Sequence, residues 1–190
     1  MVAFAHGSGS GRLSPRNQFV AAALRRSGLA TLLFDLLTDP EAANRRNVFD
    51  IPLLSDRLLQ ATRWIGAQSG IGALPLGYFG ASTGAAAALV AAAHVRSGIA
   101  AVVSRGGRPD LAGPALPLVT APTLLIVGGA DDVVLELNRE ALGHLTCEKR
   151  LTVVPGATHL FEEPGALEKV VDHAQRWFVD NLVHDEDKGA

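Results

Sequence analysis

The amino-acid sequence predicts an α/β fold, in which helices flank a doubly wound, mostly parallel sheet of about six strands. Short, continuous apolar runs alternate with longer segments whose apolar residues recur at every third or fourth position, as in repeated βαβ units. The chain has 190 residues, of which 48% are hydrophobic and 19% charged. That is enough for a single domain, expected at residues 1–184, followed by a polar C-terminal tail at residues 185–190.

Six runs rich in Val, Ile, Leu or Phe are the expected strands. They are apolar throughout rather than alternating with polar residues, which predicts strands that helices bury on both faces. The expected strands are residues 2–5, 30–34, 76–79, 99–104, 123–127 and 151–154.

Helices are expected in the segments between these strands. Ser14 and Pro15 match an N-cap followed by Pro at the first helical position, and Gly28 follows the last turn of that helix. Apolar residues recur at helical spacing further along, and the alanines of one segment would let its helix lie close to the sheet. These further helices are expected at residues 51–65, 83–96, 133–145 and 164–182.

Charge and cysteine content exclude several classes of protein. The net charge of −2 and the lack of a basic block argue against a nucleic-acid or anionic-membrane partner. Residues 64–95 carry no charged side chain, but glycines, serines and a proline divide them, so no membrane span is expected. Cys147 is the only cysteine, and no metal or cofactor is expected. The N-terminus lacks the features of a signal peptide, so a cytoplasmic location is expected.

A G-x-S-x-G motif at residues 80–84 follows the third expected strand and opens a helix. This context matches a nucleophile elbow, in which a strained turn between two glycines exposes the serine hydroxyl above the sheet. Ser82 is therefore the candidate nucleophile. The alternative is an ordinary glycine-rich turn between a strand and a helix.

An acid and a histidine follow two later strands, in the order that a catalytic triad would need. Asp131 and Asp132 come after the fifth strand, and we expect Asp131 to orient the histidine and Asp132 to cap the next helix. His159 follows the sixth strand and is the candidate base. Ser82, Asp131 and His159 are thus the predicted triad.

The glycine-rich residues 6–11 follow the first strand and could supply a backbone N–H group to an oxyanion. Ser8 and Thr83, the residue after the nucleophile, are the expected oxyanion-hole donors. The alternative is a dinucleotide-binding loop, which the run resembles at its start, but Arg12 stands where that fingerprint needs its last glycine.

The sequence resembles the α/β-hydrolase superfamily, and within it the dienelactone-hydrolase-like group, including small bacterial hydrolase domains fused to phosphoribosyltransferases. The resemblance extends from residue 2 to about residue 180 and implies the same triad. Dienelactone hydrolase itself uses Cys where this chain has Ser82. The motifs that carry the resemblance lie at residues 6–10, 14–17, 80–84, 129–131 and 155–159.

Compared with that superfamily, the chain is predicted to be a minimal version without leading strands and without a lid, and the alternative explanation for the missing strands is a start that lies too late in the sequence. Only residues 1–5 precede the first glycine-rich loop, which would leave strand 30–34 at the sheet edge and favour a homodimer through that edge. Residues 105–122 are too few for a helical cap domain. An open, shallow site for small or short-chain acyl groups is therefore expected.

Arg105 and Arg12 are the candidate substrate-binding residues, because an arginine can bind a carboxylate with two hydrogen bonds. A structural pairing of Arg105 and Arg108 with Asp110 or another carboxylate is the favoured alternative, and Arg16 raises the same question.

Together these features predict a serine hydrolase that acts on small carboxylic esters through an acyl-enzyme, with lactones and thioesters as further candidate substrates. The alternatives are a non-catalytic α/β-hydrolase-fold domain that binds a ligand or partner, and an acyltransferase.

Overall fold

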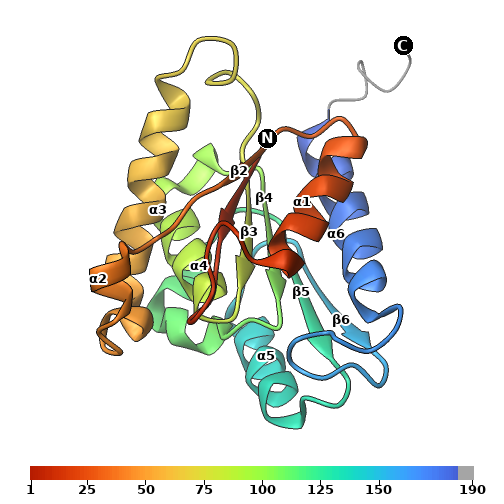
Figure 1. Ribbon diagram of the computed structural model, residues 1–190. Coiled ribbons are helices and arrows are strands. Elements are labelled where there is room, and N and C mark those ends of the chain that lie inside the picture. The colour runs from red at the N-terminus through yellow and green to blue at the C-terminus, as the bar shows by residue number, and fades with distance from the viewer. Residues whose placement is uncertain (184–190) are drawn as a thin grey trace.

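The computed structural model describes residues 1–183 and places a six-stranded sheet at the centre of the molecule (Figure 1). All neighbouring strands are parallel, in the order β2-β1-β3-β4-β5-β6, which confirms the predicted fold class. The tail predicted at residues 185–190 lies outside the described residues. The strands are β1 (Val2–Ala5), β2 (Thr31–Leu33), β3 (Gly77–Ala81), β4 (Ala101–Arg105), β5 (Thr123–Gly128) and β6 (Lys149–Val154).

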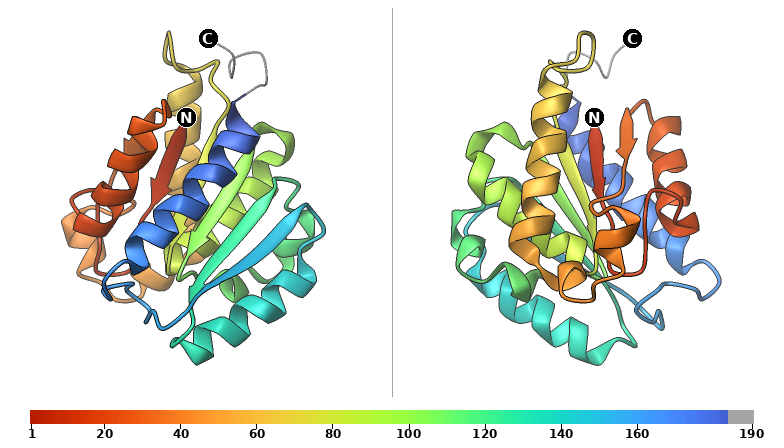
Figure 2. Two further views of the ribbon diagram at one scale, coloured as in Figure 1. Left: turned by 90° about the vertical axis from the view of Figure 1, so that its right-hand side faces the viewer. Right: turned by 60° about the vertical axis from the view of Figure 1, so that its left-hand side comes forward.

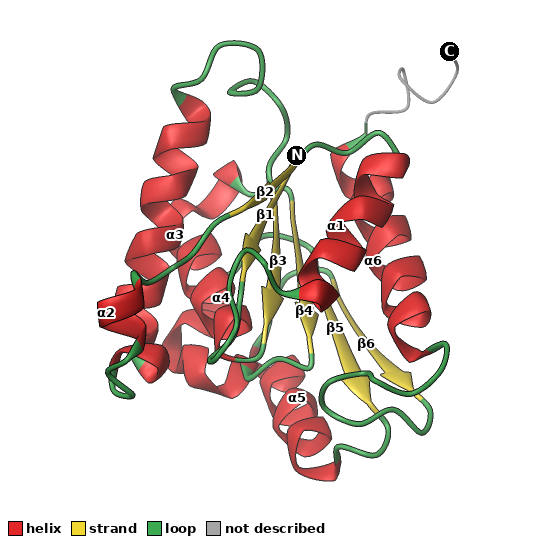
Figure 3. Ribbon diagram, viewed as in Figure 1, coloured by secondary structure: helices red, strands yellow, loops and turns green. Residues whose placement is uncertain are grey.

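Helices cover both faces of the sheet, as Figures 2 and 3 show. One face packs against α1 (Pro15–Arg26) and α6 (Ala166–Leu182). The other packs against α3 (Ile51–Gly66) and α4 (Thr83–Val95) and, over β5 and β6, against α5 (Asp132–His144). The shorter elements are α2 (Asp39–Ala42) and the 3₁₀ segments η1 (Asn47–Phe49), η2 (Arg96–Gly98) and η3 (Pro109–Leu118).

The strands are apolar throughout because successive side chains enter the two different helix layers. On β3, Tyr78 packs into the core beneath α3 and α4, while Phe79 packs into the core beneath α1 and α6. Every residue of β3, β4 and β5 is buried. The sheet is therefore fixed on both sides, and its strand ends are rigid supports for the loops that leave them.

The strand order reverses between β1 and β3, since the chain passes from β1 to the edge strand β2 and then returns to the other side of β1. At such a switch point the loops diverge to opposite faces and leave a crevice at the carboxyl ends of the strands. The loop after β1 and the turn between β3 and α4 flank this crevice. Both segments carry residues of the predicted site.

The edges of the sheet and the lid region follow the sequence-based expectations in part. Strand β2 lies at the edge, and its three residues are half-buried. The homodimer through this edge stays a prediction. Residues 105–122 contain the 3₁₀ segment η3 and no α-helix.

Of the residues described, none belongs to a helix with both the length and the apolar character that crossing a membrane requires.

Gly84 is the position where the packing of α4 on the sheet demands a glycine. A Cβ there would collide with the carbonyl oxygens of Ala5 and His6, at the end of β1. The helix axis can approach the first strand this closely only because residue 84 has no side chain.

We predict that Gly84→Ala destabilises the fold by about 1–3 kcal/mol, because a methyl group cannot fit against backbone atoms that do not move. Gly143→Ala in α5 is the matched control, since a Cβ there meets nothing within 4 Å. In that helix, alanine should be neutral or stabilising by up to about 1 kcal/mol. Urea unfolding of both variants measures the effects, and equal changes would contradict the role of Gly84.

Candidate active site

Ser82 occupies a strained turn between β3 and α4. Its φ of 51° and ψ of −124° lie in a region that non-glycine residues rarely adopt. Three backbone hydrogen bonds hold the turn. The Ser82 N–H donates to the Arg105 carbonyl at 3.4 Å, and the Ser82 carbonyl accepts from the N–H groups of Ala85 and Arg108, both at 3.1 Å. This is the geometry of a nucleophile elbow.

The loop after β1 lies directly against this elbow. A Cβ on Gly7 would be 2.8 Å from the Ser82 Cβ, so the two backbones are in close contact. The N–H groups of Ser8 and Thr83 take part in no hydrogen bond with any of residues 1–183. Both residues line the same cavity. The two expected oxyanion donors are thus unengaged and border one space.

His159 and Asp131 meet through their side chains. The His159 Nδ1 lies 2.7 Å from Asp131 Oδ2, and the carboxylate side chain is only 16% exposed. Because a carboxylate accepts, Nδ1 carries the proton in this contact, which leaves Nε2 of the neutral ring free to act as a base. Asp131, rather than Asp132, stands at the N-cap position of α5, so the predicted cap assignment of Asp132 is wrong. Neither the Asp131 nor the Asp132 side chain makes a capping hydrogen bond.

Backbone contacts fix the loops that carry the acid and the histidine to each other. The Ala130 N–H donates to the Ala157 carbonyl at 2.9 Å, and the Gly129 N–H donates to the Val154 carbonyl at 2.8 Å. Glu163 strengthens the second loop, because its Oε1 accepts from both the N–H and the hydroxyl of Thr158, next to His159. No sequence pattern points to Glu163, since its partner is visible only in three dimensions.

The loop after β4 separates the elbow from the histidine. Gly106, with a φ of 50°, lies so close to His159 that a Cβ there would be 3.0 Å from the His159 carbonyl oxygen and 3.6 Å from Nδ1. The neighbouring Arg105 and Arg108 bond to the backbone of Ser82. The loop after β4 thus contacts both Ser82 and His159, and no hydrogen bond joins the Ser82 hydroxyl to His159 in the described part of the chain.

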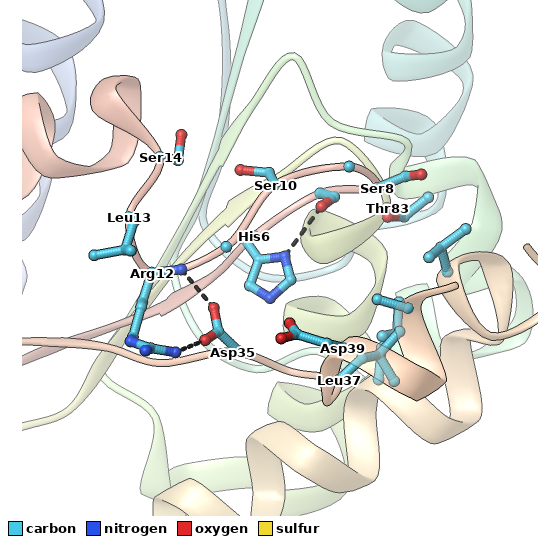
Figure 4. Close-up of a pocket in the computed structure, with 16 residues that line it drawn as sticks. His6, Ser8, Ser10, Arg12, Leu13, Ser14, Asp35, Leu37, Asp39 and Thr83 are labelled. Atoms are coloured by element: carbon cyan, nitrogen blue, oxygen red, sulfur yellow. Dashed lines mark hydrogen bonds and ion pairs between the residues drawn. The ribbon is translucent and has the colours of Figure 1, made fainter. Parts of the chain in front are cut away.

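A cavity of about 430 Å³ opens beside the elbow (Figure 4). Its polar side holds the serines of the β1 loop together with Asp35 and Asp39, and its apolar side is formed by Leu37, Val48 and Leu54. Leu54 comes from α3, while α2 and η1 close the outer wall. Sequence reasoning missed this wall, because α2 and η1 are too short to produce a helical period.

His6 links the loops after β1 and β2 at the base of this cavity. Its Nε2 accepts from the Leu36 N–H at 2.9 Å, so Nδ1 must carry the proton and donate to the Gly7 carbonyl at 3.0 Å. The ring is therefore neutral. Burial lowers the pKa of His6 below its ordinary value of 6.5.

The arginines around the site have different partners. Arg12 forms an ion pair with Asp35 at the edge of the cavity, and Arg16 lies 3.2 Å from Glu162. Arg108 donates two hydrogen bonds to Asp110, at 2.8 and 2.7 Å, so the predicted pairing holds for Arg108. It is wrong for Arg105, which has no carboxylate partner among residues 1–183.

The parallel sheet, the elbow and the acid–histidine pair after later strands together define the α/β-hydrolase fold. No family model matches the chain. A solved structure of dienelactone hydrolase from Anabaena variabilis is 56% identical, covers 95% of this chain and 86% of its own, and superposes with a TM-score of 0.93. The chain therefore belongs to the dienelactone-hydrolase-like family of α/β-hydrolases.

More distant solved structures share the fold alone. Est1E from Butyrivibrio proteoclasticus is 16% identical with a TM-score of 0.80, over 96% of this chain and 88% of its own. A dienelactone-hydrolase-like promiscuous phosphotriesterase from metagenomic libraries is 19% identical with a TM-score of 0.73, over 95% of this chain and 85% of its own.

The curated relatives are longer than this chain. Two proteins from strains of Mycobacterium tuberculosis, provisionally named phosphoribosyl transferases, are 63% identical over 182 residues and 96% of this chain. The chain spans only 41% of their length. Their names therefore describe proteins with a large part that has no counterpart here.

We predict that protonation of His6 weakens the fold at low pH. Because the pKa of folded His6 is lowered, the unfolded chain binds the proton first, so the His6 contribution is complete above pH 6.5 and declines as pH falls from 6.5 toward the folded pKa. Urea unfolding of wild type and His6→Gln at pH 7.5 and 5.0 tests this. The stability advantage of wild type over the variant should shrink at pH 5.0, and an unchanged advantage would contradict it.

Proposed function

We propose that the chain is a serine hydrolase of small carboxylic esters that acts through Ser82, His159 and Asp131. The observation that supports this most directly is the 2.7 Å contact between His159 and Asp131 beside the strained elbow of Ser82. A strained serine backbone costs about 1–3 kcal/mol, which a fold retains where exposing the hydroxyl serves a purpose. A binding domain would need neither the strain nor the oriented histidine.

In the proposed reaction, His159 Nε2 takes the proton from Ser82 Oγ as this oxygen attacks the ester carbonyl carbon. The negative charge moves to the carbonyl oxygen, which accepts hydrogen bonds from the N–H groups of Ser8 and Thr83. His159 then gives the proton to the departing alcohol, leaving an acyl group on Ser82. Water, deprotonated by the same Nε2, then attacks the acyl carbon, and the histidinium returns this proton to Ser82 Oγ as the bond from Oγ to the acyl carbon breaks and the acid is released. Asp131 stabilises the histidinium formed in both steps.

The substrate is proposed to be small or to carry a short acyl chain. The cavity beside Ser8 and Thr83 has about 430 Å³, and no α-helix covers it from residues 105–122. Lactones and thioesters use the same chemistry and belong to the proposed class. Acyl transfer to an acceptor other than water would use the same acyl-enzyme.

Among residues 1–183, no three or more His, Cys, Asp or Glu side chains gather in a group that could hold a metal ion.

We predict that Ser82→Ala lowers kcat for 4-nitrophenyl acetate by about 10⁴-fold or more, because the nucleophile is lost. Asp131→Asn should lower it by about 10²–10⁴-fold, because the histidine then loses its orienting acceptor. Asp132→Asn is the matched control and should retain nearly full activity. A fluorophosphonate probe should label wild type at Ser82. An active Ser82→Ala enzyme, or equal losses at Asp131 and Asp132, would refute the assignment.

We also predict that kcat/KM for 4-nitrophenyl esters is highest for short acyl chains and falls steeply as the chain outgrows the cavity. Val48→Ala removes two methyl groups from the apolar wall, which enlarges the cavity, and should move the optimal acyl-chain length to longer chains. Val133→Ala, whose side chain is exposed on α5 outside the cavity, should leave the optimum unchanged. An optimum that does not respond to Val48→Ala would place the acyl chain elsewhere.

A further inference from the structure

Asn138 is a buried asparagine that joins the helix of the candidate acid to the loop beside the candidate nucleophile. It lies in α5 and is 0% exposed. Its Nδ2 donates two hydrogen bonds, one to the Val134 carbonyl of the same helix at 2.8 Å and one to the Gly107 carbonyl at 3.0 Å. Both partners can only accept, so the amide must turn its NH₂ group toward them.

The bond to Gly107 is what this amide contributes outside its own helix. Burying an amide is costly unless protein groups replace the hydrogen bonds it made with water, and Asn138 Oδ1 has no donor among residues 1–183. The bond to Val134 lies within one turn of α5 and positions nothing else. A leucine of similar size would fill the same space and bury no polar atom. The link from α5 to the loop after β4 is therefore the distinctive role of an asparagine here.

Gly107 belongs to a short loop that contacts both parts of the candidate site. The N–H of the next residue, Arg108, donates to the Ser82 carbonyl at 3.1 Å. The preceding residue, Gly106, lies so close to His159 that a Cβ there would be 3.0 Å from the His159 carbonyl oxygen. A shift of this loop would consequently disturb the backbone of the elbow and the backbone of the histidine together.

The loop is held from two sides. On the side of α4, a Cβ on Gly107 would overlap Ser104 Oγ and lie 2.6 Å from Ala85 Cβ, so the loop cannot move closer to that helix. On the side of α5, Asn138 provides the restraint. Within residues 1–183, it is the one side chain that forms a hydrogen bond with the backbone of residues 105–108. Without it, packing would limit the loop in one direction only.

The helix that carries Asn138 begins at the candidate acid. Asp131 is the N-cap residue of α5, and its carbonyl accepts from the Leu135 N–H at 2.8 Å. Asn138 follows Asp131 by about two helical turns, so the two residues lie on the same side of α5. The bond from Asn138 to Gly107 thus ties the loop to the element that positions the acid.

We propose that Asn138 is a positioning residue, which fixes the loop of residues 105–108 relative to the acid–histidine pair. The inference rests on the proposed function, because that reaction requires His159 Nε2 to face Ser82 Oγ. A misplacement of about 1 Å between reacting groups can lower a rate about 100-fold. Asn138 does not line the cavity beside the elbow, so its loss should affect kcat and leave KM nearly unchanged.

Two variants of Asn138 separate the bond to Gly107 from the bond within α5. Asn138→Ser retains a bond inside the helix, since a serine hydroxyl can donate to the carbonyl four residues earlier, as Ser27 does to Ala23 at 3.2 Å. Its hydroxyl is one bond shorter than the amide and does not reach Gly107. Asn138→Leu keeps the size of the side chain and removes both bonds.

Asn181→Ser in α6 is the matched control. The Nδ2 of Asn181 also donates to the carbonyl four residues earlier, that of Trp177, at 2.8 Å. Among residues 1–183, Asn181 forms no side-chain hydrogen bond to another element. The same substitution therefore removes an equivalent amide without affecting the loop after β4.

The measurements are kcat and KM for 4-nitrophenyl acetate, well below the unfolding temperature of every variant. Both Asn138 variants should lower kcat by about 10–100-fold and change KM by less than about twofold, while Asn181→Ser should keep the wild-type kcat. The pH of half-maximal kcat/KM should equal that of wild type, because the contact between His159 and Asp131 is intact. A merely structural role would lower the unfolding temperature and leave the kcat of the folded enzyme unchanged.

Several results would overturn the proposal. A wild-type kcat in Asn138→Ser would show that the bond to Gly107 positions nothing. A shifted pH profile, or a KM that rises as kcat falls, would show damage to the acid–histidine pair or to the cavity. An equal loss in Asn181→Ser would show a general effect of the substitution. If neither Asn138 variant folds, the bond serves the fold rather than the reaction. Failure of the proposed function is recognised separately, by full activity in Ser82→Ala.

Discussion

The close approach of backbones between the end of β1 and the turn from β3 to α4 is the constraint on which the candidate site depends. Gly84 lies against the carbonyl oxygens of Ala5 and His6, and Gly7 lies against Ser82. These contacts exist because the strand order reverses at β1 and β3, so that α1 and α4 leave to opposite faces. With larger side chains at these glycines, the two expected oxyanion donors could not border one cavity.

Much of this arrangement can be predicted from the sequence, because it depends on local patterns. The apolar runs locate all six strands, and the strand-end positions of Ser82, Asp131 and His159 identify the candidate triad. The start of β6 escapes prediction because Lys149 and Arg150 belong to an edge strand, where charged side chains reach water. Conversely, Ile99 is buried but precedes β4, so the apolar run begins earlier than the strand does.

Contacts between residues far apart in the chain are what the sequence could not predict. Whether Asp110 pairs with Arg105 or with Arg108 depends on the face to which each arginine side chain points, on either side of the turn at Gly106. Nothing in the glycine-rich run that begins at His6 points to Leu36, and only the fold brings the Leu36 N–H to the His6 ring. The short α2 and η1 are recognisable only with α3 in place beside them, because they have no amphipathic period of their own.

The backbone hydrogen bonds between the Asp131 loop and the His159 loop make these two loops one structural unit. The candidate acid and base follow the adjacent strands β5 and β6, whereas the candidate nucleophile follows β3, and strand β4 lies between β3 and β5. The site is thus modular. A substitution of Ser82 would therefore leave the hydrogen bonds between the Asp131 loop and the His159 loop in place.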